Sequence, residues 1–301
     1  MASADLIGVT AALFLEYVVG ITLNIYILIV YIGNLKNGLS LGPSDMIHFT
    51  KALVNVSMQA PMISQNIFFW RHLFFINEVF LFFMFSNLFV VAYNSWLTAL
   101  LCVYYCTNIT TSSHRGLAWL KRSLSSYLLR ILLLSGLFSV VICSTLFWFR
   151  STEFVGNRSH QSIVIHGTFH QHNSYRFIPA ILGFFLPLTI IFISTTLTAW
   201  SLINHIWRMK QNNTGSKLQT QINATRTMVL FLLSAIINNV VFYLYFTVKP
   251  KGSAVELFII WIFFISLFIS EAIIIIQSSM KLRKTVVKFL VRANSNRETE
   301  T

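Results

Sequence analysis

Long apolar runs separated by short polar stretches are the main pattern of the chain. Seven runs reach the length of about 20 mostly apolar residues that a helix needs to cross a hydrocarbon core. They predict transmembrane helices at approximately residues 6–33, 45–70, 79–109, 127–149, 177–205, 227–248 and 255–277. The pattern therefore predicts an all-α membrane protein, in which residues 1–301 form a single bundle of seven transmembrane helices.

The composition agrees with a membrane protein and argues against a soluble one. Of the 301 residues, 55% are hydrophobic and only 10% are charged, whereas about a quarter of a soluble domain is charged. All three cysteines, Cys102, Cys106 and Cys143, lie in apolar runs, which excludes a disulfide framework. Residues 1–5 contain no Lys or Arg, so the first run is expected to be a retained span rather than a signal peptide.

The basic residues predict the orientation of the bundle. There are 22 Lys and Arg against 9 Asp and Glu, an excess that in a soluble protein would indicate nucleic-acid binding. Sixteen of the 22 lie at one predicted face of the membrane, in alternate loops, helix ends and the tail. By the positive-inside rule this face is cytoplasmic, so the N-terminus is expected outside the plasma membrane and the C-terminus inside, with no role in binding nucleic acid.

The segment after the seventh predicted span has an amphipathic pattern. In residues 279–291 the apolar side chains fall on one helical face, and most of the basic ones lie elsewhere. This predicts a short cytoplasmic helix on the anionic inner leaflet, with membrane lipid as its partner. The alternative is a basic flank without fixed structure. Residues 292–301 are expected to be disordered.

Three charged residues lie within the predicted spans: Glu16, Lys51 and Glu271. Such residues are costly in a membrane and are candidates for function. The chain shows no repeat of two halves, as many transporters do, and no filter-like loop of a channel. Seven spans with basic inner loops are the layout of a G-protein-coupled receptor, although this is an analogy of architecture alone.

Local motifs make the comparison more specific. Glu16, Gly20 and Asn24 form ExxxGxxxN, and Trp96, Leu101, Tyr105 and Ser113 precede LAWLK at 117–121, in the expected second inner loop. The fifth run ends in SLxxHxxxM, from Ser201 to Met209, and the tail begins with KLR at 281–283. Across essentially the whole chain, these blocks resemble the type 2 bitter taste receptors.

The resemblance implies a receptor for small bitter-tasting or toxic molecules that activates a heterotrimeric G protein with a gustducin-like Gα. It implies no cofactor and no enzymatic activity. The family has a glycosylated second outer loop, and Asn157-Arg158-Ser159 is a sequon at that place. A type 1 vomeronasal-like receptor is the nearest alternative, and a small membrane transporter is a more distant one.

The resemblance also predicts where ligand and G protein bind. The pocket is expected among the outer halves of the spans, with Trp96 at the family's pocket tryptophan and with Gln65, Asn66, Trp261 and Phe264 as companions. The alternative for Trp96 is a core or interfacial aromatic. The expected G-protein contacts at the inner face are Lys121, Arg122, His205, Met209 and Lys281. The alternative for the basic residues is that they only mark the cytoplasmic side of the membrane, and the alternative for His205 is a helix-end residue favoured by the helix dipole.

No catalytic constellation is present in the sequence. Four histidines, His160, His166, His170 and His172, cluster in the predicted second outer loop. A zinc site is conceivable there, but a polar loop with titratable groups is favoured, and no metal is predicted.

The chain departs from the family at several polar positions. Asn55 stands where the family has Arg, Glu271 where it has His, Ser279 where it has Asn and Asn238 where it has Tyr. Lys51 lies one helical turn before Asn55, towards the cytoplasm. We therefore hypothesise that Lys51 and Glu271 pair inside the bundle and hold its inactive arrangement. The alternative is that Lys51 extends to the inner interface.

Overall fold

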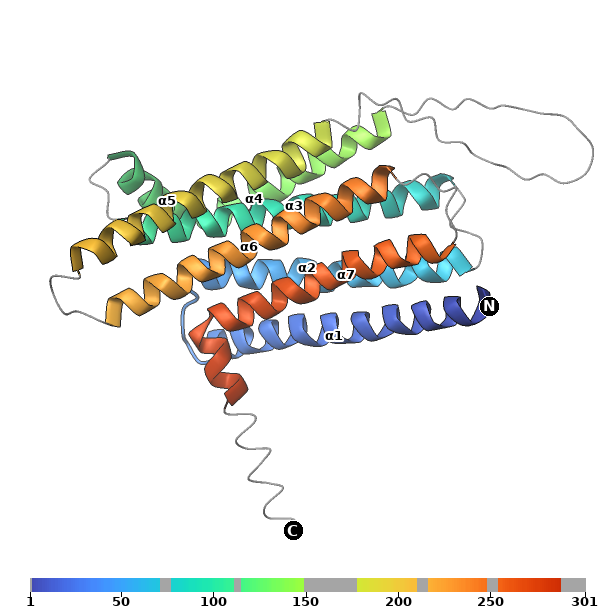
Figure 1. Ribbon diagram of the computed structural model, residues 1–301, viewed down its shortest axis with the longest axis horizontal. Helices are drawn as coiled ribbons and strands as arrows, with labels where there is room; N and C mark the ends of the chain where they lie inside the picture. The colour runs from blue at the N-terminus through green and yellow to red at the C-terminus, as the bar shows by residue number, and fades with distance from the viewer. Residues whose placement is uncertain are drawn as a thin grey trace, which may run out of the picture.

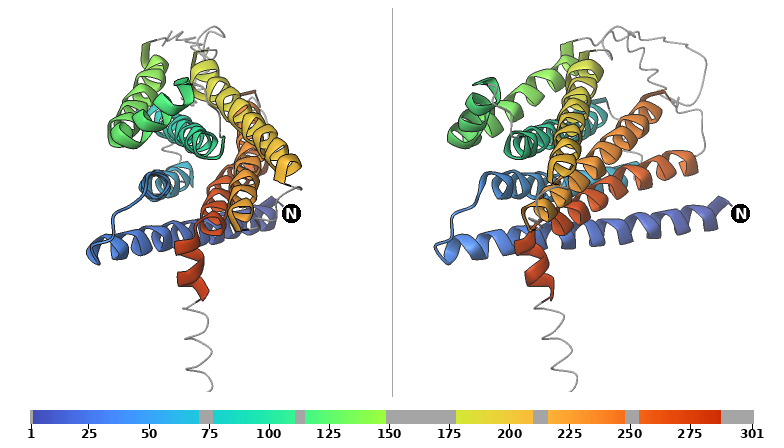
Figure 2. Two further views of the ribbon diagram at one scale, coloured as in Figure 1. Left: turned by 90° about the vertical axis from the view of Figure 1, so that its left-hand side faces the viewer. Right: turned by 60° about the vertical axis from the view of Figure 1, so that its left-hand side comes forward.

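The computed structural model describes residues 2–70, 77–110, 115–148, 178–209, 216–247 and 254–287. In these ranges the chain forms a bundle of long helices that run side by side, as Figures 1 and 2 show. The helices are α1 (Ala2–Lys36), α2 (Pro43–Trp70), α3 (Asn77–Ile109), α4 (Arg115–Trp148), α5 (Leu186–Met209), α6 (Ser216–Thr247) and α7 (Ala254–Ser278), with a π-helix, η3 (Pro179–Phe185), leading into α5. A terminal helix, Met280–Val287, follows α7 at an angle of 90°.

The expected all-α membrane fold is confirmed. By length and composition, five of the described helices are able to cross a membrane, or up to six if α7 and the terminal helix count as one bent span. Helix α2 is not among these five, although its 28 residues exceed the length needed. Its polar side chains lower its hydropathy, and they point into the bundle. The boundaries of the spans within the bilayer stay predictions.

Helix α3 is the central helix of the bundle. It packs against α2, α4, α5 and α6, whereas α1 packs mainly against α2 and α7. The end view in Figure 2 shows α4 and α5 on one side of α3 and α1 on the other. We call the end of the bundle where α1 begins its N-terminal end, and the end where α7 finishes its C-terminal end.

The turn between α1 and α2 has clear stop and start signals. Gly38 adopts a positive φ of 76°, a conformation that glycine reaches without strain. The Leu39 amide donates to the Asn34 carbonyl at 3.0 Å, which closes α1 with a Schellman-type cap. Pro43 then stands at the first position of α2, where a missing N–H costs little.

The segment before the fourth predicted span is helical. Residues 117–121 are helical and form part of α4. The helix bends at Tyr127, whose φ of −116° and ψ of 15° are not helical, so the predicted start of the fourth span coincides with a kink. The Arg130 guanidinium lies over the Tyr127 ring, 5.4 Å from its centroid, and this cation–π contact supports the bend.

Candidate functional site

A stripe of polar side chains runs along α2 and faces the inside of the bundle. Its members recur every three to six residues and are all buried: His48, Lys51, Asn55, Gln59 and Gln65. A spacing of three or four residues places side chains on one face of a helix. In a membrane protein such a face points away from lipid. Helix α2 therefore presents a row of polar side chains to the core of the bundle.

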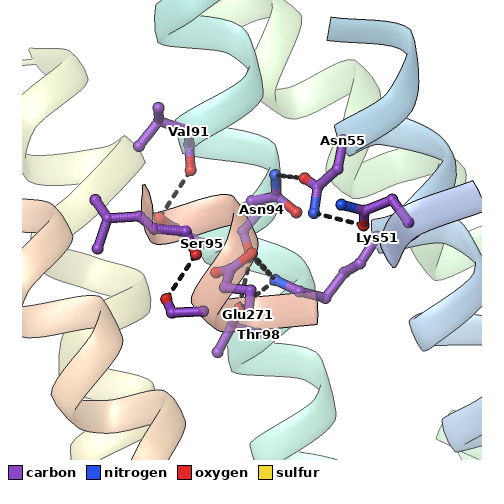
Figure 3. A network of polar contacts seen from close by, with 10 residues as sticks. Lys51, Asn55, Val91, Asn94, Ser95, Thr98 and Glu271 are labelled. Atoms are coloured by element: carbon purple, nitrogen blue, oxygen red, sulfur yellow. Dashed lines mark hydrogen bonds and ion pairs between the residues drawn. The ribbon is translucent and has the colours of Figure 1, made fainter. Parts of the chain in front are cut away.

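Lys51 is at the centre of a buried polar cluster, shown in Figure 3. Its ammonium donates to the Thr98 hydroxyl at 2.7 Å and to the Asn94 carbonyl at 3.2 Å. The Glu271 carboxylate of α7 lies 3.3 Å from the same nitrogen. The ammonium thus joins α2 to α3 and α7.

Two asparagines extend this cluster toward α1. The Asn94 amide donates to Asn55 Oδ1 at 2.7 Å, and the Asn55 amide donates to Asn24 Oδ1 at 3.3 Å. Asn24 in turn donates to the Gly20 carbonyl within α1. We call Lys51, Asn55, Asn94, Thr98 and Glu271 the Lys51 network; through Asn24 it connects four helices.

The ion pair is enclosed by protein. The Lys51 side chain is 0% exposed and that of Glu271 only 10%. On its α6 side, the ammonium faces the ring of Phe231, whose centroid is 5.8 Å away. Each charge pays a large desolvation cost, which the opposite charge and the hydrogen bonds to Lys51 offset. The structure thus places the two predicted charges together, and Lys51 does not extend to the interface.

A second polar contact lies closer to the N-terminal end of the bundle. The Asn87 amide of α3 donates to Gln65 Oε1 at 2.9 Å. Gln65 Nε2 is buried and has no hydrogen-bond partner among the described residues. Because Asn87 occupies the oxygen, the free nitrogen is left as a donor. Gln65 was predicted from the sequence as a pocket residue, whereas its partner Asn87 was not. The sequence feature that could have indicated Asn87 is its position seven residues before Asn94, which places both asparagines on the same face of α3.

The geometry of Trp96 differs from that of Gln65. Its ring packs edge-to-face on Phe138 of α4, with centroids 5.5 Å apart. Two residues along a helix correspond to about 200° of rotation, so Trp96 faces away from the side of α3 that carries Asn94. This packing fits the alternative of a core aromatic better than direct ligand contact, although Trp96 Nε1 is buried without a described partner.

The remaining predicted pocket residues lie in α2 and α7. Phe264 packs edge-to-face on Phe268, with centroids 5.5 Å apart, and contacts the hydrophobic core. Asn66 and Trp261 belong to α2 and α7, but their side chains are outside the described part of the chain.

The C-terminal end of the bundle fixes the terminal helix in three ways. Lys281 forms an ion pair with Asp45 of α2 at 2.7 Å, and the Tyr26 hydroxyl of α1 donates to the Leu282 carbonyl at 2.8 Å. The Leu282 amide donates to the Ser279 hydroxyl at 3.5 Å, so Ser279 caps the helix. Lys281 was expected to contact the G protein, and its ammonium is engaged with Asp45.

The other predicted coupling residues lie near this end. Lys121 and Arg122 are exposed, in the part of α4 before its kink. His205 and Met209 belong to the last two turns of α5, and nothing is described of their side chains. Asn157 and the four histidines of the predicted outer loop lie outside the described residues. Within those that are described, no group of three or more His, Cys, Asp or Glu is arranged to hold a metal.

Comparison with known proteins gives a consistent family match. The family model described as Taste receptor protein (TAS2R) matches residues 1–294. The chain is 26% identical to taste receptor type 2 member 143 of Rattus norvegicus, over 64% of this chain and 67% of that protein. It is 28% identical to member 40 of Gallus gallus, over 57% and 58%, and 26% identical to member 4 of Gorilla gorilla gorilla, over 94% and 96%. The matched segment thus spans about two thirds or less of the first two relatives.

Proposed function

Because the chain belongs to the Taste receptor protein (TAS2R) family, we propose that it is a G-protein-coupled receptor for small bitter-tasting or toxic molecules. The match of the family model to residues 1–294 carries this proposal. The named relatives are type 2 taste receptors, and they favour neither a vomeronasal receptor nor a transporter.

The ligand is proposed to bind between α2, α3 and α7, toward the N-terminal end of the bundle. The buried Gln65 amide supports this location, because Asn87 holds its oxygen while its nitrogen is free to donate. A buried donor without a partner is costly, and a ligand acceptor would satisfy it. Phe264, Asn66 and Trp261 would add apolar and polar surface on α7 and α2. Trp96 would support α3 through its contact with α4.

Activation is proposed to be a shift between two helix arrangements. A ligand favours signalling only if it binds the active arrangement better than the inactive one. The Lys51–Glu271 pair ties α2 to α7 and is proposed to favour the inactive arrangement.

At the C-terminal end, Lys121 and Arg122 are exposed and available to contact a gustducin-like Gα, together with His205 and Met209. Lys281 would act indirectly, through the terminal helix that it fixes.

The terminal helix is proposed to lie on the cytoplasmic leaflet of the plasma membrane. Its angle of 90° to α7 is the angle that a helix parallel to the membrane surface makes with a span. Arg283, Lys284, Met280 and Val287 are exposed on it, which is a mixture that suits anionic lipid headgroups and acyl chains.

The proposal is tested by expressing the chain with a promiscuous or gustducin-like Gα and recording calcium release against bitter compounds. We expect at least one agonist, and a weaker or altered agonist response in Gln65→Leu. Trp200→Ala is the matched control, since Trp200 is exposed on α5, and should respond as the wild type does. Ligand-dependent uptake or current that needs no G protein would overturn the proposal.

A further inference from the structure

Phe231 brings α6 into contact with the Lys51 network. Its side chain is fully buried, and its ring centroid lies 5.8 Å from the Lys51 ammonium. Among the described contacts of that ammonium, those on α3 and α7 are polar: the Asn94 carbonyl, the Thr98 hydroxyl and the Glu271 carboxylate. The contact with α6 is different in kind, because an aromatic face attracts a cation through its quadrupole.

Helix α6 is therefore bound to the Lys51 ammonium in a different way from α3 and α7. The ammonium of Lys51 is held by two acceptor oxygens on α3 and by the Glu271 carboxylate on α7, so its position does not depend on α6. The Phe231 ring, in contrast, moves with α6. A cation–π contact is strongest for a desolvated cation, and it requires the cation to lie within about 6 Å of the ring centroid. At 5.8 Å, the contact is lost if α6 moves outward by a small distance.

We propose that the attraction between Lys51 and Phe231 holds α6 in its resting position, and that Phe231 is therefore a positioning residue for activation. This inference rests on the proposed function, because it assigns a resting and an active position to α6. Helix α6 also packs against α5, α7 and α3, so the contact biases the equilibrium rather than fixing it. The ligand then has to supply the free energy that breaks it.

The test changes the electrostatics of the ring and leaves its size almost unchanged. Phe231 is replaced by fluorinated phenylalanines with one, two and three fluorines, which weaken the negative face stepwise. We expect basal signalling to rise with each fluorine, by about threefold to tenfold in total. In a Lys51→Met/Glu271→Gln background, which carries neither charge, the same series should change nothing. The matched control is the same series at Phe268, a buried phenylalanine of α7 that packs on Phe264.

A second measurement makes the result independent of G-protein coupling. Spin labels are attached at Leu39→Cys and Ile222→Cys, which lie near the C-terminal end and are exposed, while the native cysteines are buried. Distances between the labels should shift toward a longer population as fluorines are added. A shift without signalling would overturn the proposed receptor function and leave the role of Phe231 standing. Equal distance distributions in all variants, or a fluorine effect that persists without Lys51, would overturn the role of Phe231.

Discussion

At the scale of single residues, a lysine that is completely buried in a membrane bundle needs unusual support. Lys51 receives it from two oxygens of α3 and from the Glu271 carboxylate. Removing one partner of such a pair leaves a buried charge uncompensated, whereas removing both removes the desolvation cost as well. The pair is therefore more informative about conformation than about stability.

This argument predicts an asymmetric result for variants of the pair. Lys51→Met should lower the free energy of unfolding by about 3–5 kcal/mol, because it strands the Glu271 carboxylate. Lys51→Met/Glu271→Gln should recover most of that loss. Thermal unfolding of the purified protein measures both, with the exposed Lys284→Met as control. Strictly additive losses would argue against a direct interaction.

A second prediction concerns the approach of α1 to α2 at Gly20. A Cβ atom there would lie 2.9 Å from Gln59 Nε2, whereas one at Gly33 would meet nothing within 4 Å. Gly20→Ala should therefore cost about 1 kcal/mol, since the buried Gln59 amide must shift. Gly33→Ala should gain up to about 1 kcal/mol from helix propensity.

The measurement for these glycine variants is again thermal unfolding. In a Gln59→Ala background the cost of Gly20→Ala should disappear, because the atom that the new methyl group meets is gone. If Gly20→Ala and Gly33→Ala behave alike in both backgrounds, the close approach does not determine the role of Gly20.

The sequence predicted these residue-scale features unevenly. Charged residues are rare in spans, so Lys51 and Glu271 were recognisable as a candidate pair. Asn94, Thr98 and Phe231 were not, because a single polar residue or one of 28 phenylalanines carries no local signal. Their roles depend on which face of α3 or α6 meets Lys51. For the same reason the sequence did not show that Trp96 turns toward α4.

At the scale of elements, the apolar runs predicted where helices occur, but not where they bend. Kinks depend on tertiary contacts: the bend at Tyr127 is accompanied by the Arg130 cation–π contact, whereas Pro61 lies inside α2 without ending it. The terminal helix was expected from its amphipathic pattern. Its attachment to α1 and α2 was not, because Tyr26 and Asp45 are far from it in sequence.

The break between α7 and the terminal helix leads to a prediction about Ser279. Ser279→Ala removes the hydroxyl that accepts from the Leu282 amide and should cost about 1 kcal/mol of local stability. Ser279→Asn, which is also a good cap, should retain it. Hydrogen exchange of the amides in residues 280–287 measures the effect. Ser278→Ala is the control, since that hydroxyl donates within α7, to the Ile275 carbonyl; equal exchange in both alanine variants would contradict capping.

At the scale of the whole molecule, the bundle has two chemically different ends. The first segment of α4, the beginning of α6 and the terminal helix lie at the C-terminal end. They carry eight of the 22 Lys and Arg, and 16 of the 22 lie at the face predicted to be cytoplasmic. Lys and Arg within about 15–20 residues of a span are retained in the cytoplasm. The +13 net charge is therefore a property of one face of the protein, and the proposed coupling residues belong to that face.

This distribution predicts the orientation in the plasma membrane. A tag at the N-terminus should be detected on intact cells, and a tag at the C-terminus only after permeabilisation.

The Asn157 sequon lies in the connection between α4 and α5, which joins them at the N-terminal end of the bundle, so it should be glycosylated in the lumen of the secretory pathway. Asn157→Gln should then abolish a mass shift that is sensitive to glycosidase. Asn212→Gln should not, because the Asn212-Asn213-Thr214 sequon lies in the connection between α5 and α6, at the opposite end of the bundle. Glycosylation at Asn212 instead, with the C-terminal tag exposed on intact cells, would reverse the orientation and remove the proposed coupling face from the cytoplasm.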